Sequence, residues 1–240
     1  MSESAAAGFD AEPAAAGSAT GVRVKIWDGA IRLVHWSFVL LLPALWWTHR
    51  SGDIWLHQRL GYLMLGLLLF RVYWGLVGST TARFGAFVKG PGVVAGYIRA
   101  LLSRSAEPIV GHNPLGGWSV IALLGLLIGQ VSLGLITQDT DGIESGPLSY
   151  LVEYETADWA RDWHERIFYV LLAFVALHVA AILFHLLVKR DNLVGPMVTG
   201  HRRISHAAPL PTVAPLGRAA VGAVLSAGLV WWVSLGCPLP

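Results

Sequence analysis

The chain has 240 residues, of which 55% are hydrophobic and only 13% are charged, against roughly a quarter charged in a typical soluble domain. This composition excludes an ordinary water-soluble fold and favours a membrane protein. The net charge of +2 is too small to indicate nucleic-acid binding, so no nucleic-acid partner is predicted. The single cysteine, Cys237, cannot form an internal disulfide, a CxxCH heme attachment or a thiolate metal cage.

The N-terminal segment lacks the pattern of a targeting signal. Residues 1–21 are rich in Ala and Gly, carry Glu3, Asp10 and Glu12, and have no apolar core preceded by positive charge. A secretory signal peptide requires such a core. We therefore predict a disordered N-terminal tail over residues 1–23.

Five apolar stretches follow, each long enough to cross the roughly 30 Å hydrocarbon core of a bilayer as one helix of roughly 20 residues. They cover residues 31–48, 56–77, 118–136, 167–188 and 219–235. The first four share histidines near their ends, whereas the fifth contains no titratable residue. The prediction is an all-α fold: an integral membrane four-helix bundle over 24–203, a linker over 204–216, and an additional C-terminal transmembrane helix within 217–240.

A shorter amphipathic segment lies between the second and third spans. Over residues 92–104, apolar side chains recur at helical spacing beside Arg99 and Arg104. The pattern predicts a helix that rests on the membrane surface, and a loop helix packed on protein explains it equally well.

Lys and Arg are distributed unevenly between the two sides of this bundle. Thirteen of the 17 lie on the side of the N-terminus and four on the other. Because cytoplasmic loops carry the excess of positive charge, we predict a multi-pass protein of the bacterial cytoplasmic (inner) membrane with a cytoplasmic N-terminus and a periplasmic C-terminus. The loop over 137–163 is acidic and is predicted to face the periplasm, where it either docks a partner with a basic face or is only solvated.

Four histidines in the apolar spans are the main functional pattern, because ionisable residues inside membrane helices are costly and usually functional. His35 belongs to the first span, His57 begins the second, and the fourth carries His164 and His178. The last two are fourteen residues apart, which is about 21 Å along a helix and nearly one face. One helix therefore offers two histidines at two depths.

The direction of each helix decides which histidines can meet. The first span enters from the N-terminal side, so His35 can meet only His178; the second enters from the other side, so His57 can meet only His164. This predicts one bis-histidine site in each half of the membrane. Heme suits such sites because its iron takes axial histidines and its apolar macrocycle fills the space between helices. Zinc normally takes four ligands at one point.

Three further residues are predicted to contact heme. Gly61 follows His57 by one turn on the same face and lets a flat ring come close, although helix packing explains a glycine equally well. Arg32 and Arg71 lie near the cytoplasmic ends of their spans and are candidates to pair with heme propionates. Snorkelling to the interface is the alternative for both arginines.

The other histidines are weaker candidates. His185 lies seven residues beyond His178, and three roles stay open: a replacement ligand, a proton donor to a quinone, or an interfacial residue. The rest flank helices at turns or lie in a basic tail and are not predicted as ligands: His49, His112, His201 and His206.

Several short segments together carry a family pattern. They are residues 32–36 (Arg-Leu-Val-His-Trp), 57–62 (His-Gln-Arg-Leu-Gly-Tyr), 69–75 (Leu-Phe-Arg-Val-Tyr-Trp-Gly), 111–118 (Gly-His-Asn-Pro-Leu-Gly-Gly-Trp), 163–165 (Trp-His-Glu), His178 and 192–200. With them the chain resembles the prokaryotic cytochrome b561 family, which includes the b-type membrane subunits of nickel-iron hydrogenases and relatives serving formate dehydrogenases. The resemblance covers roughly residues 24–203, and the fifth span and Cys237 lie outside it.

The resemblance implies a diheme membrane cytochrome. It implies two b hemes ligated by His35, His57, His164 and His178, and electron exchange between an outer redox partner and the quinone pool. The expected partners are membrane lipid, quinone, and a periplasmic c-type cytochrome or hydrogenase-like protein. The acidic outer loop slightly favours the c-type cytochrome.

Two other functions compete with electron transfer. Some small members of this family look like enzymes that oxidise superoxide and reduce quinone, but that role needs a cationic funnel at the outer heme. The only candidates for it are Arg59, Arg161 and Arg166, on a face that is acidic. A heme-free transporter with a histidine relay is the third possibility. The sequence therefore favours an electron-transfer subunit over a stand-alone enzyme.

Overall fold

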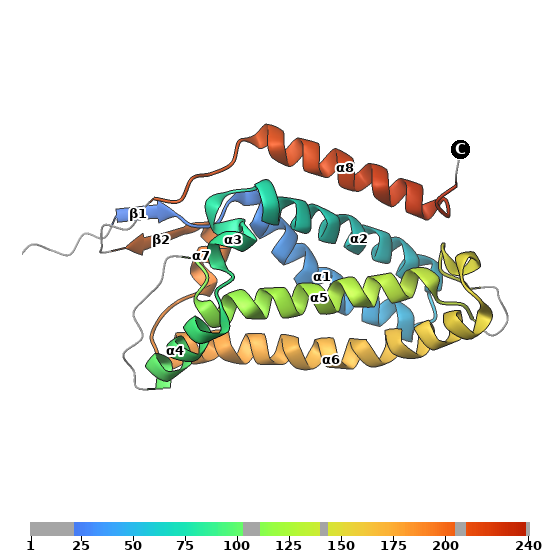
Figure 1. The fold of residues 1–240 in the computed structure, drawn as a ribbon, viewed down its shortest axis with the longest axis horizontal. Coiled ribbons are helices and arrows are strands. Elements are labelled where there is room, and N and C mark those ends of the chain that lie inside the picture. Colours follow the sequence, from blue (N-terminus) through green and yellow to red (C-terminus); the bar gives the residue numbers. More distant parts are fainter. Residues whose placement is uncertain (1–21, 103–110, 140–143, 205–209, 239–240) are drawn as a thin grey trace, which may run out of the picture.

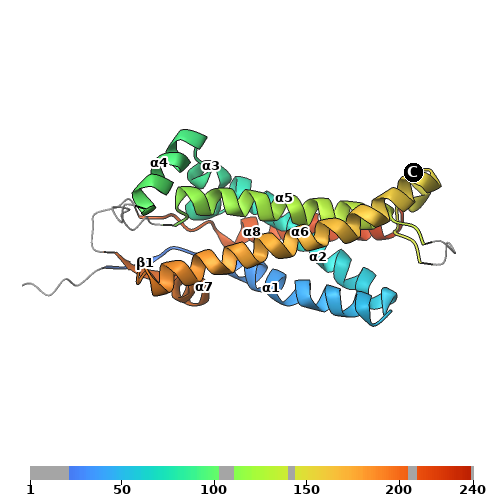
Figure 2. The same cartoon turned by 90° about the horizontal axis from the view of Figure 1, so that it is seen from below.

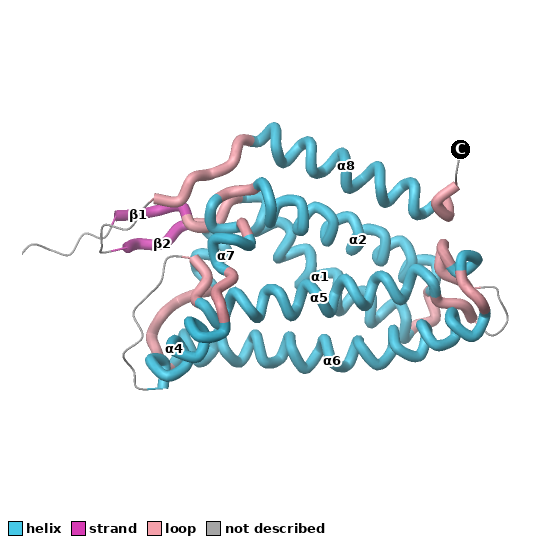
Figure 3. The backbone as a smooth tube through the Cα atoms, viewed as in Figure 1, coloured by secondary structure: helices cyan, strands magenta, loops and turns pink. Residues whose placement is uncertain are grey.

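The computed structural model describes residues 22–102, 111–139, 144–204 and 210–238, and these form an elongated bundle of helices (Figures 1 and 3). Five helices are long and apolar enough to cross a membrane: α1 (Gly29–Arg50), α2 (Ile54–Val77), α5 (Pro114–Ile136), α6 (Tyr154–Leu187) and α8 (Leu216–Ser234). The prediction of an all-α integral membrane protein is confirmed. Most of the predicted disordered tail lies outside the described residues.

Local capping groups determine where the long helices begin. The Asp28 carboxylate accepts the amide N–H of Ile31 at the start of α1, 2.8 Å away. Asp53 does the same for Leu56 in α2, and the Asn113 side chain accepts the N–H of Gly116 in α5. Such caps satisfy amide groups that have no partner inside the helix. Each helix therefore begins two to four residues before its apolar stretch.

Helix α6 is the main departure from the predicted boundaries. It begins at Tyr154 and has 34 residues, which is about 51 Å of helix. The prediction of a loop as far as residue 163 is therefore wrong for residues 154–163. Ion pairs between residues one turn apart stabilise the start of this helix: Arg161–Asp158 at 2.5 Å and Arg166–Asp162 at 3.3 Å.

Short elements gather at one end of the bundle, which we call the ribbon end. Strand β1 (Val22–Lys25) pairs antiparallel with β2 (His201–Ile204) there, beside η1 (Thr80–Ala82), α3 (Phe84–Phe87), α4 (Pro91–Leu102) and α7 (Val194–Thr199). The strands were not predicted, because their pairing joins segments far apart in the sequence. The predicted amphipathic helix is confirmed over Pro91–Leu102; it packs on α5 and accepts a hydrogen bond from Lys189 at the Leu101 carbonyl.

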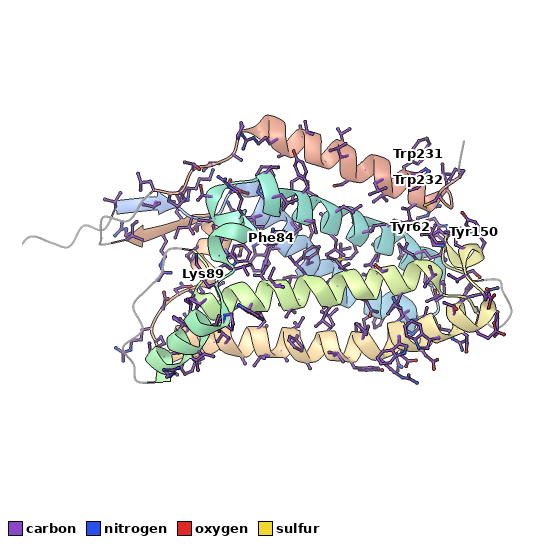
Figure 4. The ribbon with its side chains drawn as sticks, in the orientation of Figure 1. Tyr62, Phe84, Lys89, Tyr150, Trp231 and Trp232 are labelled. Atoms are coloured by element: carbon purple, nitrogen blue, oxygen red, sulfur yellow. The ribbon has the colours of Figure 1, made fainter. Side chains whose placement is uncertain are left out.

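The opposite end, which we call the loop end, contains the α1–α2 turn, η2 (Ser149–Leu151) and the start of α6. Seven of the 11 tryptophans lie here on helix ends, and each is at least 39% exposed: Trp46, Trp47, Trp55, Trp159, Trp163, Trp231 and Trp232. Figure 4 shows the last two on α8 near Tyr150. Tryptophan prefers the boundary between lipid and water, so this ring of aromatic side chains agrees with a helix bundle that spans a bilayer.

The interior between α1, α2, α5 and α6 is apolar. Helices α5 and α6 lie side by side, and Figure 2 shows α6 running the length of the bundle. One cluster of buried residues joins these four helices: Leu41, Met64, Leu68, Leu124, Leu127 and Leu171. The cluster lies midway between the two ends and therefore separates the polar groups at one level from those at the other.

Helix α8 packs on α2, on the side of α2 away from α6 (Figure 1). Gly222 is buried against Tyr73 and Phe70, and a Cβ atom built on Gly222 would lie 2.5 Å from the Tyr73 ring. Small residues let membrane helices approach closely. The Tyr150 hydroxyl also donates to the Gly236 carbonyl just beyond α8, so α8 is attached to the bundle at both ends.

We expect Gly222→Ala to loosen α8, because the added methyl group must displace Tyr73 or the helix, at a cost of about 1–3 kcal/mol. Gly228→Ala on the same helix is the matched control, since nothing lies within 4 Å of a Cβ built there. Thermal unfolding in detergent, followed by circular dichroism, should show a lower Tm for Gly222→Ala only. Equal Tm values for both variants would show that this packing contact is unimportant.

Candidate functional site

The structure brings the four predicted histidines together in two pairs at two levels. His57 on α2 and His164 on α6 meet near the loop end. His35 on α1 and His178 on α6 lie near the ribbon end, close enough for their rings to interact electrostatically. The antiparallel directions of α1, α2 and α6 produce this pairing, as the sequence predicts.

The pair near the loop end has the spacing of two imidazoles on one metal. The ring centroids of His57 and His164 are 6.2 Å apart and the rings are nearly perpendicular, at 82°. A metal–imidazole bond is about 2 Å long and the ring nitrogen lies about 1.1 Å from its centroid, so a metal held between two imidazoles would place their centroids about 6 Å apart. The separation of the His57 and His164 rings matches this spacing.

Both rings of this pair are held by backbone carbonyls. His57 Nδ1 donates to the carbonyl oxygen of Leu45 at 3.0 Å, and His164 Nδ1 donates to that of Gln130 at 2.8 Å. With the proton on Nδ1, the Nε2 lone pair of each neutral ring is free to bind a metal. Histidines that bind metals usually donate their other ring N–H to a carbonyl or carboxylate in this way, which fixes the ring's orientation.

A cavity of about 440 Å³ surrounds this pair. Its wall includes both histidines and Gly61, and nothing lies within 4 Å of a Cβ atom built on Gly61. The remaining wall is mainly apolar, with Leu42, Leu45, Met64 and Leu127 among its residues. A flat, mostly apolar group held by two histidines fits this shape and this set of donors.

Gly134 on α5 is needed for the position of the His164 ring. A Cβ atom built on Gly134 would lie 2.9 Å from His164 Cε1. By contrast, nothing lies within 4 Å of a Cβ built on Gly125 or Gly129 of the same helix. Of these three glycines of α5, only Gly134 is in contact with a site residue.

We expect Gly134→Ala to tilt His164 and to change the environment of any metal bound there. The added methyl group must move the ring by a few tenths of an ångström, which weakens its hydrogen bond to Gln130. Electron paramagnetic resonance of the oxidised protein should show a shifted low-spin signal for one site only. Gly129→Ala is the control, and identical spectra from the two variants would argue against a ligand role for His164.

The pair near the ribbon end is less tightly held. His35 Nδ1 is buried and has no hydrogen-bond partner among the described residues. The side chain of Trp36 stands edge-on to the His35 ring, with centroids 5.2 Å apart. A buried imidazole nitrogen without a partner is costly, so this level also has an unsatisfied group that a cofactor could satisfy.

The two predicted arginines have different surroundings. Arg32 donates to the carbonyl oxygens of Met197 and Val198 and so joins α1 to α7. Arg71 is only 4% exposed; it donates to the Ala82 carbonyl at 3.4 Å and lies 5.0 Å above the Phe84 ring. Of the two arginines, Arg71 is therefore the one near His35 and His178 that has N–H groups without a hydrogen-bond partner among the described residues.

Two histidines not predicted as ligands lie beside the sites. His49 lines the loop-end cavity, with its ring 5.9 Å from that of His57. His112 lies near Arg71, His35 and His178, and burial, followed by the charge of Arg71, lowers its pKa to about 3. His112 belongs to the Gly-His-Asn-Pro segment noted in the sequence, but the position of its ring depends on tertiary contacts.

Comparisons with known proteins find a matching family and similar relatives. The family model described as prokaryotic cytochrome b561 matches residues 26–200. The chain is 26% identical over 213 residues to the Probable Ni/Fe-hydrogenase B-type cytochrome subunit of Rhizobium leguminosarum bv. viciae, covering 75% of this chain and 88% of that protein. The Probable Ni/Fe-hydrogenase 1 B-type cytochrome subunit of Escherichia coli (strain K12) is 24% identical over 212 residues, covering 74% and 89%. No solved structure gives a significant match.

The matched region contains α1, α2, α5 and α6 with all four histidines, and it ends before α8. The apolar helices and the names of the relatives support a transmembrane protein that carries b-type heme and takes part in electron transport. This chain belongs to the prokaryotic cytochrome b561 family.

Proposed function

We propose that this chain is a diheme cytochrome that passes electrons across the bacterial cytoplasmic membrane, between a periplasmic redox protein and the quinone pool. The observation that carries the proposal is the His57–His164 pair, with nearly perpendicular rings 6.2 Å apart and Nδ1 groups bonded to backbone carbonyls. Two imidazoles at this separation, each with Nε2 free, would hold a heme iron between them.

The second heme is proposed between His35 and His178. This level has the same antiparallel pair of helices, α1 and α6, and the buried Arg71 nearby. We propose Gly61 as the place where one ring face meets α2, and Arg71 as a partner for a propionate. Arg32 is a weaker candidate because its guanidinium already bonds to two carbonyls of α7.

Bound heme supplies a reversible one-electron couple. The protein determines its position and surroundings. The carbonyls of Leu45 and Gln130 hold the two imidazoles at the loop end, and the apolar cluster around Leu68 and Leu171 excludes water between the levels. Because His164 and His178 share one helix, the separation of the two levels is held at about 21 Å along α6.

We propose that the ribbon end faces the cytoplasm. The paired strands there place four basic residues at the bundle surface: Arg23, Lys25, Arg202 and Arg203. Excess Lys and Arg mark the cytoplasmic side of a membrane protein. The N-terminus is then cytoplasmic, and α8, which runs from the ribbon end to the loop end, delivers the C-terminus to the periplasm.

A periplasmic redox partner would approach the loop end, where the first turns of α6 carry Glu155, Asp158 and Asp162. Two of these carboxylates pair with Arg161 and Arg166, which reduces the net negative charge without reversing it. A partner with a basic face fits this surface. The relatives bear hydrogenase-subunit names, so we propose either a c-type cytochrome or a hydrogenase-like protein.

Three arginines of the loop end are already engaged by neighbouring side chains in the described part of the chain. Arg161 and Arg166 are in ion pairs with aspartates one turn away, and Arg59 lies 5.2 Å above the Trp55 ring. An enzyme that attracts superoxide would need positive potential at this mouth. These contacts favour the electron carrier over the superoxide-oxidising enzyme.

A quinone at the ribbon end is proposed on the family resemblance. His185, near the end of α6, has a buried Nδ1 without a partner among the described residues. Asp191 and Arg202 lie close to it and are paired at 2.5 Å. His185 and Asp191 would exchange protons with a reduced quinone from the cytoplasmic side, while Arg202 holds the Asp191 carboxylate.

An absorption spectrum of the purified protein tests the heme proposal. After reduction with dithionite, we expect the bands of low-spin b-type heme and about two hemes per chain by pyridine hemochrome assay. Two midpoints should appear in a redox titration. One heme per chain would overturn the diheme proposal, and the absence of heme would favour the transporter.

Stopped-flow mixing tests the redox partner. A reduced c-type cytochrome should reduce the hemes rapidly at low ionic strength and more slowly as salt screens the acidic surface. Reduction by a hydrogenase under hydrogen, without reaction with the c-type cytochrome, would instead identify the hydrogenase-like partner.

A further inference from the structure

His112 is held in a defined position by the turn that precedes α5. Gly111 has φ +86°, a left-handed conformation that glycine adopts without strain. The Asn113 side chain caps α5 by accepting the N–H of Gly116 at 2.7 Å, and Pro114 opens the helix. Because the residues on both sides of His112 have restricted conformations, the backbone aims its side chain inward.

The His112 ring lies between two aromatic side chains at the ribbon end. Its centroid is 4.6 Å from the Trp27 ring and 4.4 Å from the Phe87 ring. Its Nδ1 atom is buried, and the described residues offer it no hydrogen-bond partner. Packing therefore orients the ring, while one polar atom of that ring has nothing to bind.

Arg71 presents a second unsatisfied group to the same region. The charge of Arg71 lies close enough to act on the His112 ring. His35 and His178 also lie close enough to interact with that ring electrostatically. A guanidinium has five N–H donors, and among the described residues Arg71 uses one of them, on the Ala82 carbonyl. Figure 4 shows Phe84, which lies under this guanidinium, at the ribbon end.

The charge of Asp28 acts on Arg71, but the Asp28 carboxylate is hydrogen-bonded to other groups. Asp28 is buried, and its two carboxylate oxygens accept hydrogen bonds from the Ile31 N–H and from Trp74 Nε1. No ion pair between Asp28 and Arg71 is formed in the described part of the chain. A buried cation beside a spare imidazole nitrogen calls for an anion, and the positive end of the α5 dipole adds to this preference.

We propose that His112 and Arg71 together bind one propionate carboxylate of the heme between His35 and His178, with His112 Nδ1–H and the guanidinium as donors. The proposal rests on the proposed ribbon-end heme. It makes His112 a cofactor-binding residue of that heme, distinct from its axial ligands. A carboxylate satisfies both orphaned groups at once, and no other anionic group of heme exists.

The test uses the purified full-length protein and two substitutions of the same residue. His112→Leu keeps an apolar side chain between Trp27 and Phe87 but removes the donor. His112→Asn keeps an N–H near the position of Nδ1. His201→Gln, on strand β2, is the control. Heme content, redox midpoints and the propionate bending band in resonance Raman spectra are measured for each variant.

We expect His112→Leu to retain both low-spin hemes and to lower the midpoint of one, because an uncompensated propionate charge favours the oxidised iron. A tenfold change in that equilibrium corresponds to about 59 mV for a one-electron couple. The propionate band of the same heme should shift, His112→Asn should restore both readouts toward the wild type, and His201→Gln should change neither.

Other outcomes separate this inference from the diheme proposal. If the wild type binds two hemes and His112→Leu alters neither midpoint nor Raman band, the propionate contact is wrong although the diheme proposal stands. A high-spin heme in His112→Leu would make His112 an axial ligand and overturn the assignment. If both His112→Leu and His112→Asn lose the ribbon-end heme, the His112 ring acts by packing alone. That result also overturns the propionate assignment. A wild type with only the loop-end heme overturns the diheme proposal itself.

Discussion

Replacing His57 or His164 with alanine is expected to remove the same single heme and to leave the other in place. Under the proposed pairing, either substitution would delete one of the two iron ligands, and the backbone hydrogen bond that holds the remaining ring cannot replace it. The hemochrome assay should fall from about two hemes per chain to about one. Redox titration should lose the same midpoint in both variants.

His35→Ala and His178→Ala should remove the other heme and keep the midpoint that the first two variants lose. His201→Ala, at the ribbon end but on a strand, serves as the control and should keep both hemes. The four variants together test the pairing. Loss of the same midpoint from His35→Ala and His57→Ala would contradict it, because those two residues begin their helices at opposite ends of the bundle.

Gly61→Leu should exclude the loop-end heme without removing any ligand. Nothing lies within 4 Å of a Cβ built on Gly61, so the larger side chain enters the cavity of about 440 Å³ and not a neighbouring helix. The fold is then retained while the space for the macrocycle is reduced. We expect heme content to fall by about half, with the loop-end midpoint lost.

Gly125→Leu on α5 is the matched control for this substitution. A Cβ atom built on Gly125 also has no other atom within 4 Å, but Gly125 does not line the loop-end cavity. Both variants should unfold at temperatures close to that of the wild type, and only Gly61→Leu should lose heme. Two hemes with unchanged spectra in Gly61→Leu would mean that the ring lies elsewhere between the helices.

The site could be predicted in outline because helix geometry is regular. The rise per residue places His164 and His178 on one face about 21 Å apart, and the alternating directions of the spans leave one pairing. The lengths of the apolar runs determine the number of spans for a similar reason, since a bilayer has one thickness. Neither conclusion needs knowledge of side-chain contacts.

The amino-acid sequence by itself therefore determined the five spans, the levels of the histidines and the family. Only the tertiary structure decided that Gln130 anchors His164, that Gly134 makes room for it, and that His112 lies beside Arg71. These contacts join residues from different helices and loops, and their strength depends on packing and burial. Periodicity along one chain reports which face of a helix a residue occupies; it does not report what meets that face.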